Sequence, residues 1–107
     1  MKDLPPSQRP KTRYVKFKIH SAESFEIGEV VSIIWENATE YMGVEGLSKS
    51  DMWIMGEEYE SGEGFGVVRV KKSVLDSFIS SMLFVDEIDG ENCFVEVVSV
   101  SGSLKKL

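Results

Sequence analysis

The spacing of apolar residues changes repeatedly along this 107-residue chain, between the period of a strand and that of a helix, and the order of these changes constrains the fold strongly. Residues 13–20 alternate between apolar and polar side chains, as in a strand that is covered on one face. Helical spacing follows, with Ser24 as the expected N-cap and with Gly43 and Gly46 at the expected end. The first part of the chain therefore predicts one strand followed by one helix.

Three more strands and a second helix are predicted in the remainder of the chain. Residues 52–55 and 65–70 are rich in apolar side chains and are separated by a glycine-containing turn, which indicates a hairpin. Ser73 is the expected cap of the second helix. A turn at Asp89 and Gly90 precedes a valine-rich strand over residues 93–100.

The predicted order is strand, helix, strand, strand, helix, strand. Right-handed crossovers then favour an α+β fold of the ferredoxin-like or RRM-like βαββαβ kind, a four-stranded antiparallel sheet in the order 4-1-3-2 with both helices on one face. We expect residues 13–101 to form this single domain. An extended, basic, proline-rich arm is expected over residues 1–12, and a short basic tail over residues 102–107.

The charges are sorted along the sequence, although the formal net charge is -6. The first twenty residues hold six basic residues and one acid, whereas residues 21–64 hold eleven acids and one lysine. In the predicted topology the first strand begins at the edge where the third and fourth strands end, so three basic segments should converge. Such an end would suit the phosphates of a polyanion. The expected phosphate-contact residues are Arg9, Lys11, Arg13, Arg69, Lys71, Lys72, Lys105 and Lys106.

The sheet face turned away from the helices is predicted to be only partly polar. A face that meets solvent alone is usually mostly polar. We therefore expect part of it to be covered by the chain's own arm or tail, by a second copy of the chain or by another protein. The expected partner-contact residues are Tyr14, Trp53, Phe65 and Val67.

The chain offers little for catalysis or for metal binding. His20 and Cys93 are its only histidine and cysteine, and Cys93 is interpreted as a buried, inert thiol. The acids within residues 57–63 are typical of a solvated hairpin, because general acid-base catalysis needs a shielded carboxyl group. We expect no catalytic site and no metal or other cofactor on the protein.

Two further patterns limit the class of protein. Residues 63–70 partly match the octamer of RNA-recognition motifs, but Val67 and Val70 stand where that motif has aromatic rings, which disfavours base stacking on the sheet. No apolar run approaches the ~20 residues of a membrane span, and no apolar signal region opens the chain. A soluble cytoplasmic protein is therefore expected, without membrane contact.

An ordered set of short motifs resembles archaeal ribonuclease P protein component 2, a family with eukaryotic relatives. The resemblance covers nearly the whole chain, and the ordered set is more specific than any single motif. The motifs are Leu4-Pro5-Pro6, Arg13-Tyr14-Val15, Gly43-x-x-Gly46, Gly66-Val67-Val68-Arg69 and the ending over residues 98–106.

The resemblance implies a non-catalytic protein subunit of a ribozyme that removes the 5′ leader from precursor tRNA. In that family the RNA performs the chemistry with Mg²⁺, and the protein meets precursor tRNA only indirectly. The implied partners are the ribonuclease P RNA, protein component 3 and a second copy of this chain. Under this reading the basic residues named above contact the RNA.

A second function remains open from the residues alone. Domains with the same strand and helix order can be dimeric regulatory modules that sense a small ligand. Such domains bind the ligand at the loop between the first strand and the first helix, which here is residues 21–24. This loop has no glycine-rich turn, so the feature that would indicate a ligand site is weak.

Overall fold

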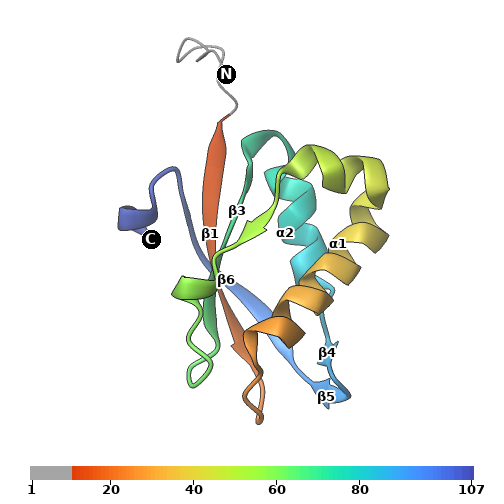
Figure 1. Cartoon of the computed structure of the whole chain (residues 1–107), viewed down its shortest axis with the longest axis vertical. Helices are drawn as coiled ribbons and strands as arrows, with labels where there is room; N and C mark the ends of the chain where they lie inside the picture. Colours follow the sequence, from red (N-terminus) through yellow and green to blue (C-terminus); the bar gives the residue numbers. More distant parts are fainter. Residues whose placement is uncertain (1–10) are drawn as a thin grey trace.

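The computed structural model describes residues 11–107, and Figure 1 shows a sheet with two main helices packed on one of its sides. The arm expected over residues 1–12 therefore lies almost wholly outside the described residues, as does Arg9. Besides three short 3₁₀ turns, the elements are β1 (Thr12–His20), α1 (Ile27–Ser50), β2 (Trp53–Ile54), β3 (Phe65–Lys71), α2 (Leu75–Leu83), β4 (Glu87–Ile88), β5 (Glu91–Asn92) and β6 (Phe94–Ser101).

The main sheet has four antiparallel strands in the order β2-β3-β1-β6. This is the expected neighbour order read from the other edge, because β6 takes the place of the expected fourth strand. The difference from the expectation is a separate two-stranded sheet, β4 with β5, around the predicted turn. Asp89 and Gly90 both have positive φ, at 50° and 83°, and this pair of left-handed residues suits a two-residue hairpin.

The core lies between the sheet and the two helices. Alternation along β1 places Val15, Phe17 and Ile19 on the helix side, where all three are buried. Ile34 of α1 and Phe78 of α2 pack into the same cluster. Each such side chain stabilises the fold by about 1.5–3 kcal/mol relative to exposure, so this cluster fixes which face of the sheet stays open.

Helix α1 begins later than Ser24 suggests, so Ser24 as the N-cap is wrong. The N-cap is Glu26, whose backbone N–H donates to Glu29 Oε1 at 3.0 Å, and the Glu26 side chain accepts from the third helical N–H in return. This is a capping box with carboxylates at both positions. Phe25 is buried immediately before it, and the chain enters the helix only after that side chain has reached the core.

Helix α1 also continues beyond its expected end at Gly43 and Gly46. Gly43 does interrupt the helix, with φ 75° and ψ 167°, but helical residues resume and continue to Ser50. Leu47 and Ser50 in this last segment are buried, so packing holds the additional turns. The glycine therefore marks a kink within one long element.

The second helix and the second strand also differ from the sequence expectations. Ser73 is not the cap of α2: a 3₁₀ turn over Lys72–Val74 leads into Leu75, and the N-cap Val74 makes no side-chain cap. The strand expected over residues 52–55 is reduced to the two residues of β2. Beyond β2, the Met55 N–H still donates to Val67 O at 3.0 Å, which keeps the chain beside β3.

The C-terminal tail folds onto the open face of the sheet. A 3₁₀ turn forms over Leu104–Lys106, and Leu104 and Leu107 line a shallow hollow together with Lys16, Phe65 and Val67. Figure 1 shows this blue tail on the opposite side of β1 from the helices. The chain's own tail therefore covers part of the open sheet face, which is one of the alternatives that the sequence allowed.

Candidate nucleic-acid interface

Three lysines from two distant parts of the chain meet at one end of the sheet. The register pairs Thr12 with Lys71, and the Lys72 N–H donates to Lys11 O at 2.8 Å. Lys11, Lys71 and Lys72 line one hollow of about 370 Å³ together with Ser73. The predicted convergence of the first and third strands' basic residues is therefore present in the structure.

Arg13 and Arg69 lie close to this end, but on opposite faces of the sheet. Arg13 shares the helix side with Val15 by alternation, and its Nη1 donates to Thr12 O at 2.8 Å. Arg69 shares the open side with Tyr14, its partner in the register. Both side chains are half-buried. One flat ligand surface cannot contact both guanidinium groups in the same way.

Lys105 and Lys106 follow the tail onto the open face instead of joining the three lysines. The leucines on either side of them lie in the hollow beside Lys16, which is near the middle of β1. The expected single cationic end is therefore divided into an end surface and a face surface. Sequence reasoning missed this because the path of the tail depends on where two leucines find apolar contact.

Few of the basic side chains are neutralised by neighbouring acids. Within residues 11–107 the ion pairs are Lys49 with Glu45 at 3.0 Å and His20 with Glu96 at 2.7 Å. Lys11, Lys71 and Lys72 take part in neither pair. Their ammonium groups are therefore available to an external anion.

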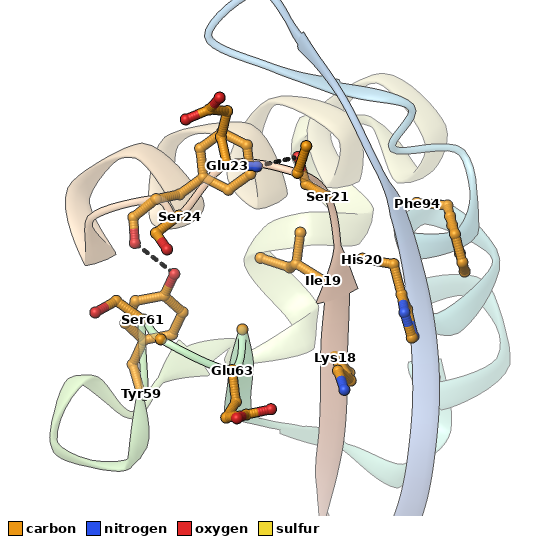
Figure 2. A pocket seen from close by; sticks show the side chains of 14 residues that line it. Lys18, Ile19, His20, Ser21, Glu23, Ser24, Tyr59, Ser61, Glu63 and Phe94 are labelled. Atoms are coloured by element: carbon orange, nitrogen blue, oxygen red, sulfur yellow. Dashed lines mark hydrogen bonds between the residues drawn. The ribbon is translucent and has the colours of Figure 1, made fainter.

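Acidic side chains lie at the opposite end of the molecule. There the loops after β1 and before β3 border a cavity of about 530 Å³, with Glu23 and Glu63 on its wall, as Figure 2 shows. Figure 1 places these loops at the lower end, away from the start of β1. These two ends differ in charge as the sequence predicts, although Lys105 and Lys106 do not join the cationic end.

Local hydrogen bonds already occupy polar groups of this cavity. Ser21 Oγ donates to Asn92 O at 3.0 Å and accepts from the Glu23 N–H at 3.2 Å. The Tyr59 hydroxyl donates to Phe25 O. These bonds tie the loop over residues 21–24 to its neighbours, so the Ser21 and Tyr59 hydroxyl groups are already engaged within the protein.

Tyr59, which lines this cavity, gives the stability of the fold a testable pH dependence. Burial raises its pKa above 10.0, and the nearby Glu29 raises it further, so the folded state favours the neutral phenol. The resulting stability is present below pH 10 and is lost as pH rises through the folded-state pKa. We expect Tyr59→Phe to lower the unfolding free energy by about 1 kcal/mol at pH 8, through the lost hydrogen bond. That deficit should shrink above pH 10.

Urea unfolding at pH 8 and at pH above 10 measures this difference. Tyr41→Phe is the matched control, because Tyr41 is half-exposed and Phe preserves its ring contact with Phe84 at 5.5 Å. A deficit for Tyr59→Phe that stays constant across this range would contradict the assigned role of burial.

Cys93 and His20, the only cysteine and histidine, lie in different local environments. Burial raises the pKa of the half-buried Cys93 thiol, and Asp86 and Glu87 raise it further, so the thiol is a poor nucleophile at neutral pH. The His20 ring stacks on Phe94 with centroids 4.4 Å apart and hydrogen-bonds to Glu96. Across the described residues, no group of three metal-ligating side chains is found.

The four expected partner-contact residues differ in their exposure. Trp53 is 60% exposed, Tyr14 and Phe65 are half-buried, and Val67 is only 5% exposed beside the tail leucines. Besides Phe94, Val98 and Val100 on β6, a group of exposed apolar side chains that was not among the expected contact residues lies on or directly after the helices. They are Trp35, Tyr41, Val44, Leu83 and Phe84.

Sequence comparison connects the chain with named archaeal proteins. Ribonuclease P protein component 2 of Methanococcus vannielii is 36% identical over 107 residues, covering 100% of this chain and 79% of that protein. The protein of the same name from Pyrococcus furiosus is 30% identical over 106 residues, covering 99% of this chain and 87% of that protein.

A comparison with solved structures finds a chain with a similar fold. A chain in the cryo-EM structure of yeast ribonuclease MRP superposes with a TM-score of 0.69, over 91% of this chain and 78% of that chain, at 19% identity. None of the helices described for residues 11–107 is long and apolar enough to cross a membrane. The model described as the Rpp14/Pop5 family matches residues 13–107. With the match spanning nearly the whole sequence, this chain belongs to the Rpp14/Pop5 family of ribonuclease P protein subunits.

Proposed function

We propose that this chain is a non-catalytic subunit that supports the RNA of ribonuclease P while that RNA removes the 5′ leader from precursor tRNA. Family membership supports the assignment to ribonuclease P. The observation that carries the RNA contact is the meeting of Lys11, Lys71 and Lys72 at one end of an otherwise acidic molecule. Such contacts position a protein on the RNA backbone and do not read its sequence.

The proposed RNA footprint is narrow. The net charge of -6 repels RNA from most of the surface, and the cationic end is a region where that repulsion is reversed. Arg13 borders this end, and Arg9 belongs to the proposed footprint although it lies outside the described residues. Mg²⁺ is expected on the RNA, with no cofactor held by the protein, and precursor tRNA is met indirectly.

Protein component 3 is the proposed protein partner, and self-association within the assembly is proposed as well. Exposed aromatic and aliphatic side chains on the helix side suit a protein contact, because such residues are enriched in the centres of interfaces. Trp53 remains in the proposed contact set. Tyr14, Phe65 and Val67 are less accessible, and Val67 can be reached only if the tail moves aside.

The fold class and the cellular location complete the proposal. The arrangement of four antiparallel strands and two helices is assigned to the ferredoxin-like class, on the order β2-β3-β1-β6. The protein is proposed to act in the cytoplasm. The small-ligand sensor is not favoured, because local hydrogen bonds already engage polar groups of the loop over residues 21–24.

Reconstitution tests the function directly. Ribonuclease P RNA, component 3 and this chain are combined at limiting Mg²⁺, and precursor tRNA cleavage is followed with and without the chain. Omission should lower the cleavage rate by about tenfold or more, equivalent to about 1.4 kcal/mol of barrier. Equal rates with and without the chain would refute the proposed role.

A further inference from the structure

The open face of the sheet contains two lysines that are not among the expected phosphate-contact or partner-contact residues. Lys16 and Lys18 follow each other on that face of β1, and both ammonium groups lie over the ring of Phe65, at 4.9 and 5.0 Å from its centroid. The ring attracts both cations, but it does not neutralise them. Two positive charges are thus held close together by one aromatic side chain.

Neighbouring acids do not pair with these lysines. Glu96 lies opposite Lys18 in the register, but its carboxylate is bound to His20 at 2.7 Å. Glu58 and Glu60 line the same hollow as Lys16, yet neither forms an ion pair with it. Within the described part of the chain, the pair of ammonium groups therefore lacks a counter-ion.

Two polar atoms on the same face are also unsatisfied. Arg69 Nε and Ser99 Oγ are shielded from solvent and have no hydrogen-bond partner among residues 11–107. The register places Arg69 opposite Tyr14 and Ser99 opposite Lys16, so both atoms belong to the open face. A shielded donor without an acceptor is costly, and a ligand oxygen would relieve that cost once a neighbouring side chain shifts to admit it.

The tail brings further charge to this face. Leu104 and Leu107 rest in the hollow beside Lys16 and Phe65, and Lys105 and Lys106 lie between them in the sequence. The strands and the tail together bring five cationic residues to the open face around the hollow, which Glu58 and Glu60 also line, and we call this surface the cationic trough. Its members are Lys16, Lys18, Arg69, Lys105 and Lys106.

We propose that this trough is a second RNA-contact surface, which receives the phosphate groups of a non-helical RNA segment. The proposal rests on the proposed function and adds to it a site separate from the end formed by Lys11, Lys71 and Lys72. Phosphates match the unpaired ammonium groups and the orphaned donors. Trp53, exposed on the edge strand beside Arg69, offers a ring face for one base.

The expected mode of contact is to the backbone, without sequence reading. The ring of Phe65 is occupied by the two lysines, and Val67 is buried, so the centre of the face has no free aromatic platform. An acidic protein segment is the competing occupant. It would also meet the cations, but it would make no use of an exposed indole ring for base stacking.

The test uses the full chain bound to component 3 and titrated with ribonuclease P RNA at several salt concentrations. Lys16→Gln with Lys18→Gln removes both charges and keeps the first two methylene groups of each side chain. Lys71→Gln with Lys72→Gln removes two charges at the end surface. Lys49→Gln is the control, since Lys49 is paired with Glu45 on α1. Circular dichroism and thermal unfolding check that each variant is folded.

We expect the Lys16/Lys18 variant to weaken RNA affinity by about 5- to 20-fold and to reduce the salt slope by about 1–2, with Lys49→Gln unchanged. An unchanged affinity for this variant, beside a loss for the Lys71/Lys72 variant, overturns the trough and leaves the proposed function standing. Unchanged affinity for both variants overturns the RNA contacts of the proposed function as well. Weaker binding to component 3 with unchanged RNA affinity would assign the face to an acidic protein segment.

Discussion

Removing the three lysines at the end of the sheet is expected to weaken RNA binding by roughly 100-fold at moderate salt. The variant is Lys11→Gln, Lys71→Gln and Lys72→Gln, measured as the complex with component 3. Each lysine that neutralises a phosphate releases a counter-ion, so the slope of log affinity against log salt should fall in magnitude by about 2–3. Filter binding or fluorescence anisotropy over a salt series measures both quantities.

A matched control separates local contact from overall charge. Ser24→Glu, Ser32→Glu and Ser61→Glu also lower the net charge by three, at exposed positions on α1 and near the acidic cavity. These three hydroxyl groups make no hydrogen bond to another described side chain or backbone group in the structure. Equal losses of affinity in the two variants would show that net repulsion governs binding and that the end surface makes no direct phosphate contact.

The strands were predictable from the sequence because their signals are local. Alternation over residues 13–20 identifies both β1 and its buried face, since successive side chains of a strand point to opposite sides. The Asp89-Gly90 turn was visible for the same reason, because few residues accept two successive left-handed conformations. The strand order then followed from connection rules.

The two ends of α1 could not be predicted from the neighbouring sequence alone. A glycine with positive φ serves equally as a helix end and as a kink, and the choice at Gly43 depends on whether the following residues find the core. Leu47 and Ser50 do, so the helix resumes. At the other end, burial of Phe25 delays the helix past Ser24, and this depends on a tertiary contact rather than on cap chemistry.

The candidate site was predictable where strand pairing determines it. Pairing of β1 with β3 brings Lys11 to Lys72, as the topology predicts. The same register places Lys18 opposite Phe65, so the two lysines over that ring could in principle have been found. The tail could not, because its path depends on a 3₁₀ turn and on two leucines that contact the sheet after the fold has formed.

Gly66→Ala is expected to destabilise the fold strongly, although it adds a single methyl group. Gly66 lies opposite Phe17 in the register, and a Cβ there would overlap Cζ of the Phe17 ring. Phe17 is fully buried and cannot move outward. Overpacking of this kind costs about 2–3 kcal/mol, against the 5–15 kcal/mol typical of a whole domain. The melting temperature should fall by about 10–20 °C.

Two further variants test whether the ring contact is the cause. Gly62→Ala, at an exposed turn where an added Cβ meets nothing within 4 Å, should change stability by less than about 0.5 kcal/mol. Phe17→Leu removes the far end of the ring, so the double variant with Gly66→Ala should be more stable than the sum of the two single losses by about 1 kcal/mol. Strict additivity in urea unfolding would show that Gly66 is required for another reason. A favourable coupling would show that β3 has a glycine at this position because the Phe17 ring of β1 occupies the space of a side chain.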